Sequence, residues 1–503
     1  MKFPCALTIF LSCWVSIVSG ASRQHNIVQD YLSSRQAIVD ELMGADVAID
    51  KSDLKVAGAI GDFNEENQQA GEAAWIFLKL LASSPLFVSQ FWQSQPLLLR
   101  AKEIEEILSQ NMKENIINWV DGSFTVENDL KLLDGSYISG SRTDDVLRQG
   151  IKTDSWAFRP IKDNPARPTT WKEVDDALKG GTIYFNSAGG FWPGLGALCR
   201  LTSYAFGLPT NINIYITPPK STVSVPPHTD RQDVIVFQTE GSKRWKVYGP
   251  PKRQKGKDPL NRGKSGDVIT KNELGDPILD VILRRGDIMY VPAGFPHTTD
   301  TVTVVEKETV PSLQDSSDRK EFDETSVHLT MGLDTHVWAL TFAHIRWTLL
   351  QRCGKDWKVD IKKDEDYWDS MRTIPVGFLS LLDGDDENAM DIAVEEVKRI
   401  LIRLEPKRWK KEALPSNEEI KDVLHYMIDD HLATLLEIQE NMYTNIKPRE
   451  EETLIKSYEC TQKQDQVMQK YGAFSNNEAM KAAFEQRRLE REKKASSAAN
   501  QEL

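Results

Sequence analysis

Two short stretches carry the residues best suited to chemistry. One is Pro226-Pro227-His228-Thr229-Asp230, and the other is Gly294-Phe295-Pro296-His297 further along the chain. A His-x-Asp pattern followed by a distant His offers one metal ion two imidazoles and a carboxylate, and it leaves other coordination positions open. His-x-Asp also occurs by chance in many long chains, so the surrounding elements have to support the interpretation.

Other motifs for chemistry are absent or weak. His25, His425 and His431 have no acidic or cysteine partner at ligand spacing, and His336 and His344 lie in a predicted helix, where packing is the expected role. The cysteines form no zinc pattern. The sequence contains no nucleophile elbow, glycine-rich phosphate loop or HExxH motif. The His-x-Asp stretch is therefore the candidate that the elements must explain.

Short strands dominate the region around the candidate site. Alternating or apolar runs punctuated by Gly or Pro predict seven strands, at residues 212–217, 233–239, 243–248, 277–283, 287–291, 298–305 and 326–333. Predicted helices at residues 65–79, 192–206 and 420–442 lie outside this run, the last after a capping box at Ser416 and Glu419. Many strands without long helices between them favour a sandwich or barrel.

The first of these strands has two different faces. Residues two apart share a face of a strand, so Asn213, Tyr215 and Thr217 lie together, and the isoleucines at 212, 214 and 216 lie on the other side. Such a strand fits a barrel whose outer side is covered by helices and whose interior holds a polar ligand.

Lys243 falls on the interior face of the next hairpin. It shares that face with Trp245 and Val247, while Arg244 and Lys246 point to water. A buried ammonium is costly unless it is paired, and an anionic ligand inside the barrel would supply a partner. The alternative is that Lys243 lies at the strand end and reaches solvent.

Two further histidines point inward. The rigid corner Pro292-Ala293-Gly294-Phe295-Pro296 presents His297 with little conformational freedom. On residues 326–333, alternation places His328 on the polar face. His328 competes with His297 as a metal ligand, although a hydrogen-bonding role behind the ligands is favoured.

Composition and charge limit the class of protein. The chain has 503 residues, 40% of them hydrophobic, which is enough for a sizeable core. The net charge of -13 argues against direct nucleic-acid binding, which needs clustered Lys and Arg. No membrane span is predicted after the N-terminal leader.

The N-terminus has the pattern of a secretory leader. Lys2 precedes an apolar run, and Val18-Ser19-Gly20 supplies small residues for cleavage. The final Glu-Leu resembles an ER-retrieval ending, so we expect the secretory pathway and the ER lumen. The alternative is a cytosolic or nuclear protein with an unstructured N-terminus.

Several motifs together resemble a known family. They are NIYITPP at 213–219, PHTD at 227–230, EGSKRWKVY at 240–248, RGDIMYVPAGFPH at 285–297, VHLT at 327–330 and FWQSQPLLLR at 91–100. These motifs resemble the cupin-type JmjC oxygenases of the ribosomal oxygenase group, which includes bifunctional lysine-specific demethylases and histidyl-hydroxylases. The resemblance covers about residues 74–340, and the combination of motifs is specific.

The resemblance implies an α+β fold and a set of cofactors. The fold would be a double-stranded β-helix, the cupin or JmjC jelly roll, flanked by helices and followed by a mostly helical C-terminal region. His228, Asp230 and His297 would hold Fe(II), 2-oxoglutarate would chelate the iron, and O2 would be the oxidant. Lys243 would meet the far carboxylate of 2-oxoglutarate, and Asn213, Tyr215 and His328 would line its pocket.

The resemblance also implies partners, and this sequence departs from the family pattern at some positions. It suggests a protein substrate, either a ribosomal protein or a histone, a homodimer, and a location in the nucleus or nucleolus as the alternative compartment. Gly332 stands where the family commonly has Ser, so one hydroxyl contact is missing. The 306–325 loop is expanded beside His297, which leaves substrate choice open.

We therefore predict the following division of the chain: a signal peptide at 1–20, a polar mobile segment at 21–64, the N-terminal part of the cupin region at 65–180, the catalytic core at 181–335, a helical region with dimerisation and winged-helix-like parts at 336–475, and a charged helical tail at 476–503. The favoured function is a 2-oxoglutarate-dependent protein hydroxylase of the histidyl type. A histone lysine demethylase and a catalytically silent cupin that binds partner proteins are the alternatives.

Overall fold

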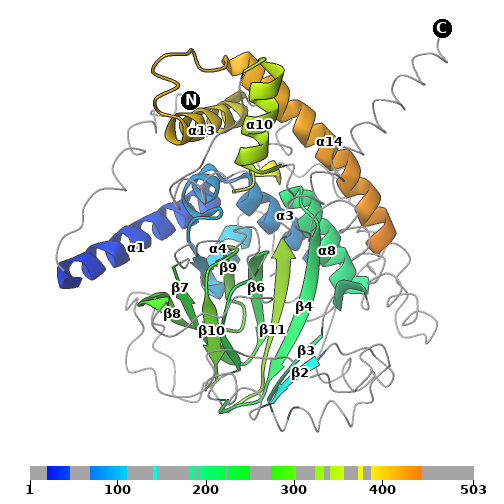
Figure 1. The fold of residues 1–503 in the computed structure, drawn as a ribbon. Coiled ribbons are helices and arrows are strands. Elements are labelled where there is room, and N and C mark those ends of the chain that lie inside the picture. The colour runs from blue at the N-terminus through cyan, green and yellow to red at the C-terminus, as the bar shows by residue number, and fades with distance from the viewer. Residues whose placement is uncertain are drawn as a thin grey trace.

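The structure is a computed structural model. In the part of the chain that it describes, eleven strands form two antiparallel sheets, with helices gathered mainly on one side (Figure 1). It describes residues 20–45, 68–109, 140–143, 178, 181–185, 188–190, 193–221, 224–230, 232–249, 274–301, 323–333, 340–355, 372–377 and 387–443. The predicted leader up to residue 19, nearly all of the 306–325 loop and the charged tail at 476–503 lie outside these residues.

The larger sheet has seven strands in the order β1-β9-β6-β11-β4-β3-β2. Their bounds are β1 Leu97–Leu99, β2 Gly140–Thr143, β3 Gly181–Phe185, β4 Thr210–Thr217, β6 Asp233–Glu240, β9 Ile288–Val291 and β11 Ser326–Leu333. On β4 the predicted alternation is present, because its three isoleucines are fully buried and Tyr215 and Thr217 lie on the opposite face.

The smaller sheet has four strands in the order β5-β10-β7-β8. Their bounds are β5 Val225–His228, β7 Ser242–Tyr248, β8 Pro277–Arg284 and β10 His297–Asp300. Strand β5 was not among the predicted strands, because Pro226 and Pro227 cannot donate hydrogen bonds to a ladder. Its place at the edge of the sheet explains why prolines are tolerated there.

Seven α-helices are described: α1 Gly20–Gly44, α3 Gln68–Ser83, α4 Ala101–Ser109, α8 Pro193–Phe206, α10 Phe342–Arg352, α13 Glu387–Leu404 and α14 Asn417–Tyr443. A π-helical turn spans Phe87–Phe91 and a 3-10 turn spans Ala188–Gly190. Helix α8 packs on β4 and β11, and α3 and α14 pack on α8. Helix α8 therefore lies directly against the larger sheet (Figure 1). No described helix has the length and apolarity needed to cross a membrane.

The prediction of a mobile segment at 21–64 is wrong for its first half. Residues 20–44 form helix α1, which buries Tyr31, Ile38, Val39 and Leu42. These positions lie on one helical face, which also carries Arg35, whose Nε donates to Leu98 O at 2.7 Å. The polar average of the segment concealed this narrow apolar face.

Candidate metal and cosubstrate site

His228 and His297 are direct partners across two neighbouring strands. His228 ends β5 and His297 begins β10, and the antiparallel register pairs their Cα atoms. Side chains at such paired positions lie on the same face and within contact distance. Their imidazole rings lie 4.3 Å apart between centroids, and both side chains are buried.

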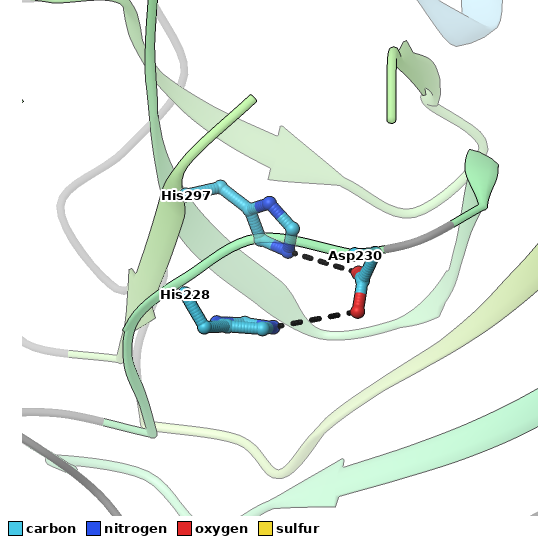
Figure 2. Close-up of side chains that lie close together, drawn as sticks. All are labelled: His228, Asp230 and His297. Carbon is cyan, nitrogen blue, oxygen red and sulfur yellow. Dashed lines mark ion pairs between the residues drawn. The ribbon is translucent and has the colours of Figure 1, made fainter. Parts of the chain in front are cut away.

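Asp230 completes the cluster from the loop that follows β5. Its carboxylate lies 3.4 Å from His297 Nε2 and 3.9 Å from His228 Nε2 (Figure 2). Its carbonyl oxygen accepts a hydrogen bond from Gly294 N at 3.0 Å. The Asp230 loop is thereby tied to the proline-rich corner that presents His297. Asp230 is the most exposed member, at 21%, so the cluster opens toward solvent on its side.

The three side chains fit a divalent transition metal. One ligand atom from each lies within 4.8 Å of the others, with two imidazole nitrogens and one carboxylate oxygen in the set. His297 Nδ1 lies 3.1 Å from Phe295 O, and a hydrogen bond donated by Nδ1 leaves the Nε2 lone pair facing Asp230. Gly294 adopts a φ of 78°, a conformation that favours glycine and shapes this corner.

Lys243 lies fully buried between the two sheets. It is on β7, and its Nζ donates to Thr217 Oγ1 on β4 at 2.7 Å. Thr217 also bonds Thr182 on β3, with the two hydroxyl oxygens 3.0 Å apart. The alternative of a Lys243 side chain that reaches solvent is therefore wrong.

Three aromatic rings pack together beside the histidine cluster. Tyr215 stacks on His328 with centroids 4.9 Å apart, and Trp245 lies 5.3 Å from His328 and 5.6 Å from His297. Burial, with smaller effects from Lys243 and His297, lowers the pKa of His328 well below its usual value of 6.5. His328 is therefore a neutral ring at physiological pH.

Three further residues that the sequence placed in the interior are His328, Asn213 and Thr217. His328 is outside the cluster of ligand atoms formed by His228, Asp230 and His297, so the structure does not favour it as a metal ligand. Asn213 is half-buried on β4 and pairs with Thr330 across the ladder, two residues from Tyr215 on the same face. The sequence predicted that Thr217 lies on the interior face. Its hydrogen bond to Lys243 was not predicted, because the bond joins two different sheets and no local sequence pattern signals it.

Gly332 is explained by close packing. A Cβ added there would lie 2.5 Å from Gln232 Oε1 and 3.0 Å from Asn211 Oδ1. The side chain of Gln232 therefore fills the space in which a serine side chain would start.

Parts of the chain are similar to known proteins. Residues 198–313 match a family model described as the JmjC domain. It is 39% identical over 108 residues to the bifunctional lysine-specific demethylase and histidyl-hydroxylase NO66 of Drosophila erecta, which is 22% of this chain and 16% of that protein. It is 30% identical over 163 residues to ribosomal oxygenase 1 of Danio rerio, 32% of this chain and 29% of that protein.

Solved structures give one further similarity. The crystal structure of the Escherichia coli ribosomal oxygenase YcfD is 16% identical, with a TM-score of 0.29, and the match covers 68% of this chain and 70% of that one. The matched part of this chain spans less than a third of the length of the two curated relatives named above.

Proposed function

We propose that this protein is an Fe(II)- and 2-oxoglutarate-dependent oxygenase that hydroxylates a side chain of a protein substrate. The observation that carries the proposal is the pairing of two features in one interior. The His228, Asp230 and His297 cluster lies on the smaller sheet and its loop, and the buried Lys243 lies on the same sheet with Trp245 between. A metal with three protein ligands and a cation placed for a dicarboxylate is the arrangement that this chemistry needs.

Each residue then has a stated role. His228, Asp230 and His297 would hold the iron, and the Phe295 carbonyl would orient the His297 ring. Lys243, held by Thr217, would bind the far carboxylate of 2-oxoglutarate, with Tyr215 and Asn213 lining the pocket. When bound, iron and 2-oxoglutarate supply the oxidation in which O2 gives one oxygen atom to the substrate as 2-oxoglutarate becomes succinate and carbon dioxide.

The proposal also covers how the two sheets close and what the C-terminal helices do. The two sheets would close into a double-stranded β-helix, since Lys243 and Trp245 from the smaller sheet contact Thr217 and His328 from the larger. Helices α10, α13 and α14 would form the C-terminal region that supports a homodimer. The family resemblance favours a ribosomal protein or a histone as substrate, and the name of the Danio rerio relative, ribosomal oxygenase 1, supports the first of these.

Lysine demethylation is the second candidate function. The name of the Drosophila erecta relative includes both demethylase and histidyl-hydroxylase activities. Mass spectrometry of substrate captured by the protein would separate them, because hydroxylation adds one oxygen atom and demethylation removes a methyl group.

We further propose that the protein enters the secretory pathway and resides in the ER lumen. The support is the apolar run that follows Lys2 and the small residues at 18–20. Imaging of the full chain with an internal tag tests this proposal. Localisation to the nucleus or nucleolus would overturn it.

Loss of the metal ligands is the direct test of function. His228→Ala and Asp230→Ala should each reduce succinate formation by at least about 100-fold, because each removes one of three protein ligands. Direct binding of Mn(II), measured by calorimetry, should weaken in parallel. His425→Ala, at an exposed position on α14, is the matched control and should behave as wild type. Equal turnover in wild type and both ligand variants would reject the site.

A further inference from the structure

The rings of Tyr215, Trp245 and His328 form what we call the aromatic wall. Trp245 lies two residues from Lys243 on the same face of β7, and its indole packs against His297 at 5.6 Å. His328 packs edge to face against Trp245, with ring centroids 5.3 Å apart, and stacks on Tyr215 at 4.9 Å. Trp245 is therefore close both to Lys243 and to the metal ligand His297, and His328 lies beside Trp245.

Two polar atoms of the aromatic wall are buried and have no hydrogen-bond partner among the residues that the structure describes. They are Trp245 Nε1 and His328 Nδ1, and their side chains are 3% and 2% exposed. A buried polar group without a partner costs about 1 to 3 kcal/mol. Most such groups in folded proteins are paired with protein, water or a ligand. Two of them on rings in contact indicate that their partner is water or a ligand and not another protein group among the described residues.

The chemistry of the two atoms defines what would satisfy them. An indole nitrogen only donates, so its partner must be an acceptor such as a carboxylate, carbonyl or water oxygen. A neutral imidazole can donate from Nδ1 to a second acceptor. An oxygen-rich anion satisfies both, and the buried ammonium of Lys243 favours that charge.

We propose that Trp245 Nε1 and His328 Nδ1 donate hydrogen bonds to oxygen atoms of the dicarboxylate that spans Lys243 and the metal ligands. This inference rests on the proposed function. It gives the aromatic wall a direct part in binding 2-oxoglutarate, beyond packing behind the histidines.

Trp245→Phe tests the proposal because it keeps an aromatic ring against His297 and removes only the indole N–H and part of the ring. The binding of 2-oxoglutarate to the Mn(II)-loaded full chain is measured by calorimetry. We expect the dissociation constant to rise about tenfold or more, as for a lost hydrogen bond to a charged group. Binding of Mn(II) itself should stay at the wild-type value.

Trp92→Phe is the matched control. Trp92 Nε1 donates to Thr373 O at 3.1 Å, and its ring packs on Phe206 and Tyr290 instead of the aromatic wall. This variant loses a buried indole hydrogen bond of the same kind, so its melting temperature should fall while its affinity for 2-oxoglutarate is unchanged.

His328→Phe is the second variant, and it preserves stacking on Tyr215. It should also weaken 2-oxoglutarate binding without changing Mn(II) affinity. If wild type binds 2-oxoglutarate and both wall variants bind it equally well, water satisfies the two atoms and the inference is wrong. If the Mn(II)-loaded wild type binds no 2-oxoglutarate, the proposed function itself fails.

Discussion

At the scale of single residues, the burial of Lys243 is the strongest sign that the protein interior receives an anion. The side chain is 0% exposed and is held by a hydroxyl at 2.7 Å. Removing an ammonium group from water costs several kcal/mol, so a fold keeps one only where its charge has a use or a partner. Binding of a carboxylate provides such a use.

Replacement of Lys243 by methionine should separate stability from binding. Methionine has a similar length and no charge, so we expect the melting temperature of Lys243→Met to equal or exceed that of wild type, because the cost of burying the charge is gone. Affinity for 2-oxoglutarate should fall about 100-fold, since a charge-assisted contact is lost. Calorimetry on the Mn(II)-loaded protein measures the second effect.

Lys246→Met on the same strand is the matched control. Lys246 is half-buried on the opposite face of β7 and does not face the interior. Its replacement should leave the affinity for 2-oxoglutarate unchanged. A similar loss of affinity in both variants would show that general charge, and not the interior position, controls binding.

At the scale of elements, the β6–β7 hairpin sets the position of Lys243. Gly241 forms its turn with a φ of 56°, and a Cβ there would lie 2.6 Å from the backbone oxygen of Thr325. The Gly241 turn is therefore fixed both by its left-handed conformation and by close approach to the chain entering β11. Lys243 follows two residues later.

Alanine substitutions at Gly241 and Gly275 separate the cost of the left-handed backbone conformation from the cost of the close contact with Thr325. Gly275→Ala, at a φ of 64° with open space around it, should cost about 1 kcal/mol from backbone strain alone. Gly241→Ala should cost about 3 kcal/mol or more, because the neighbouring backbone must also move. Urea unfolding of both variants measures the difference. Equal free energies of unfolding would mean that the Thr325 contact relaxes at no cost.

The elements also show what sequence patterns can and cannot predict. On β7 the predicted alternation matches the burial, because Lys243, Trp245 and Val247 are buried and the residues between them are half-buried. On β4 and β11 both faces are largely buried, but the alternation correctly placed Tyr215 and His328 on one shared face, where their rings stack. The capping box at Ser416 is present, with Glu419 N donating to Ser416 Oγ at 3.2 Å. Helix α1 was missed because a narrow apolar face is diluted in a polar segment.

The candidate site was predictable in its members but not in its geometry. The spacing of His228 and Asp230, the corner before His297 and the family resemblance identified all three residues. The register that pairs His228 with His297 depends on β5, which its prolines concealed. The contacts of Lys243 with Thr217 and of Trp245 with His328 join different sheets, so no local pattern contains them.

At the scale of the whole molecule, hydrogen bonds and an ion pair link the C-terminal helices α13 and α14 to the earlier part of the chain. His431 on α14 lies with its Nε2 2.6 Å from Gly207 O at the end of α8. Trp92 Nε1 donates to Thr373 O, and the neighbouring Arg372 pairs with Glu396 on α13 at 3.1 Å. Glu396 therefore connects α13 to residues 372–377, which are bound in turn by Trp92.

The pH dependence of stability should reveal the Glu396 connection. Burial raises the pKa of Glu396, but hydrogen bonds and charge from Arg399 and Arg372 outweigh it and lower the pKa below its usual 4.5. The unfolded state then binds more protons than the folded state at low pH. The stabilisation is fully present above pH 4.5 and is lost as the pH falls through the lowered folded-state pKa.

Glu396→Gln should therefore be less stable than wild type at pH 7, and the difference between the two should shrink as the pH falls below 4.5. Urea unfolding midpoints of both proteins, measured from pH 7 to below pH 4.5, give this stability difference. Glu395→Gln is the control and should differ little from wild type, because this carboxylate is 67% exposed and pairs with Lys398 one turn away. A difference between wild type and Glu396→Gln that stays constant with pH would mean that packing of α13, and not the charge of Glu396, holds the C-terminal helices in place.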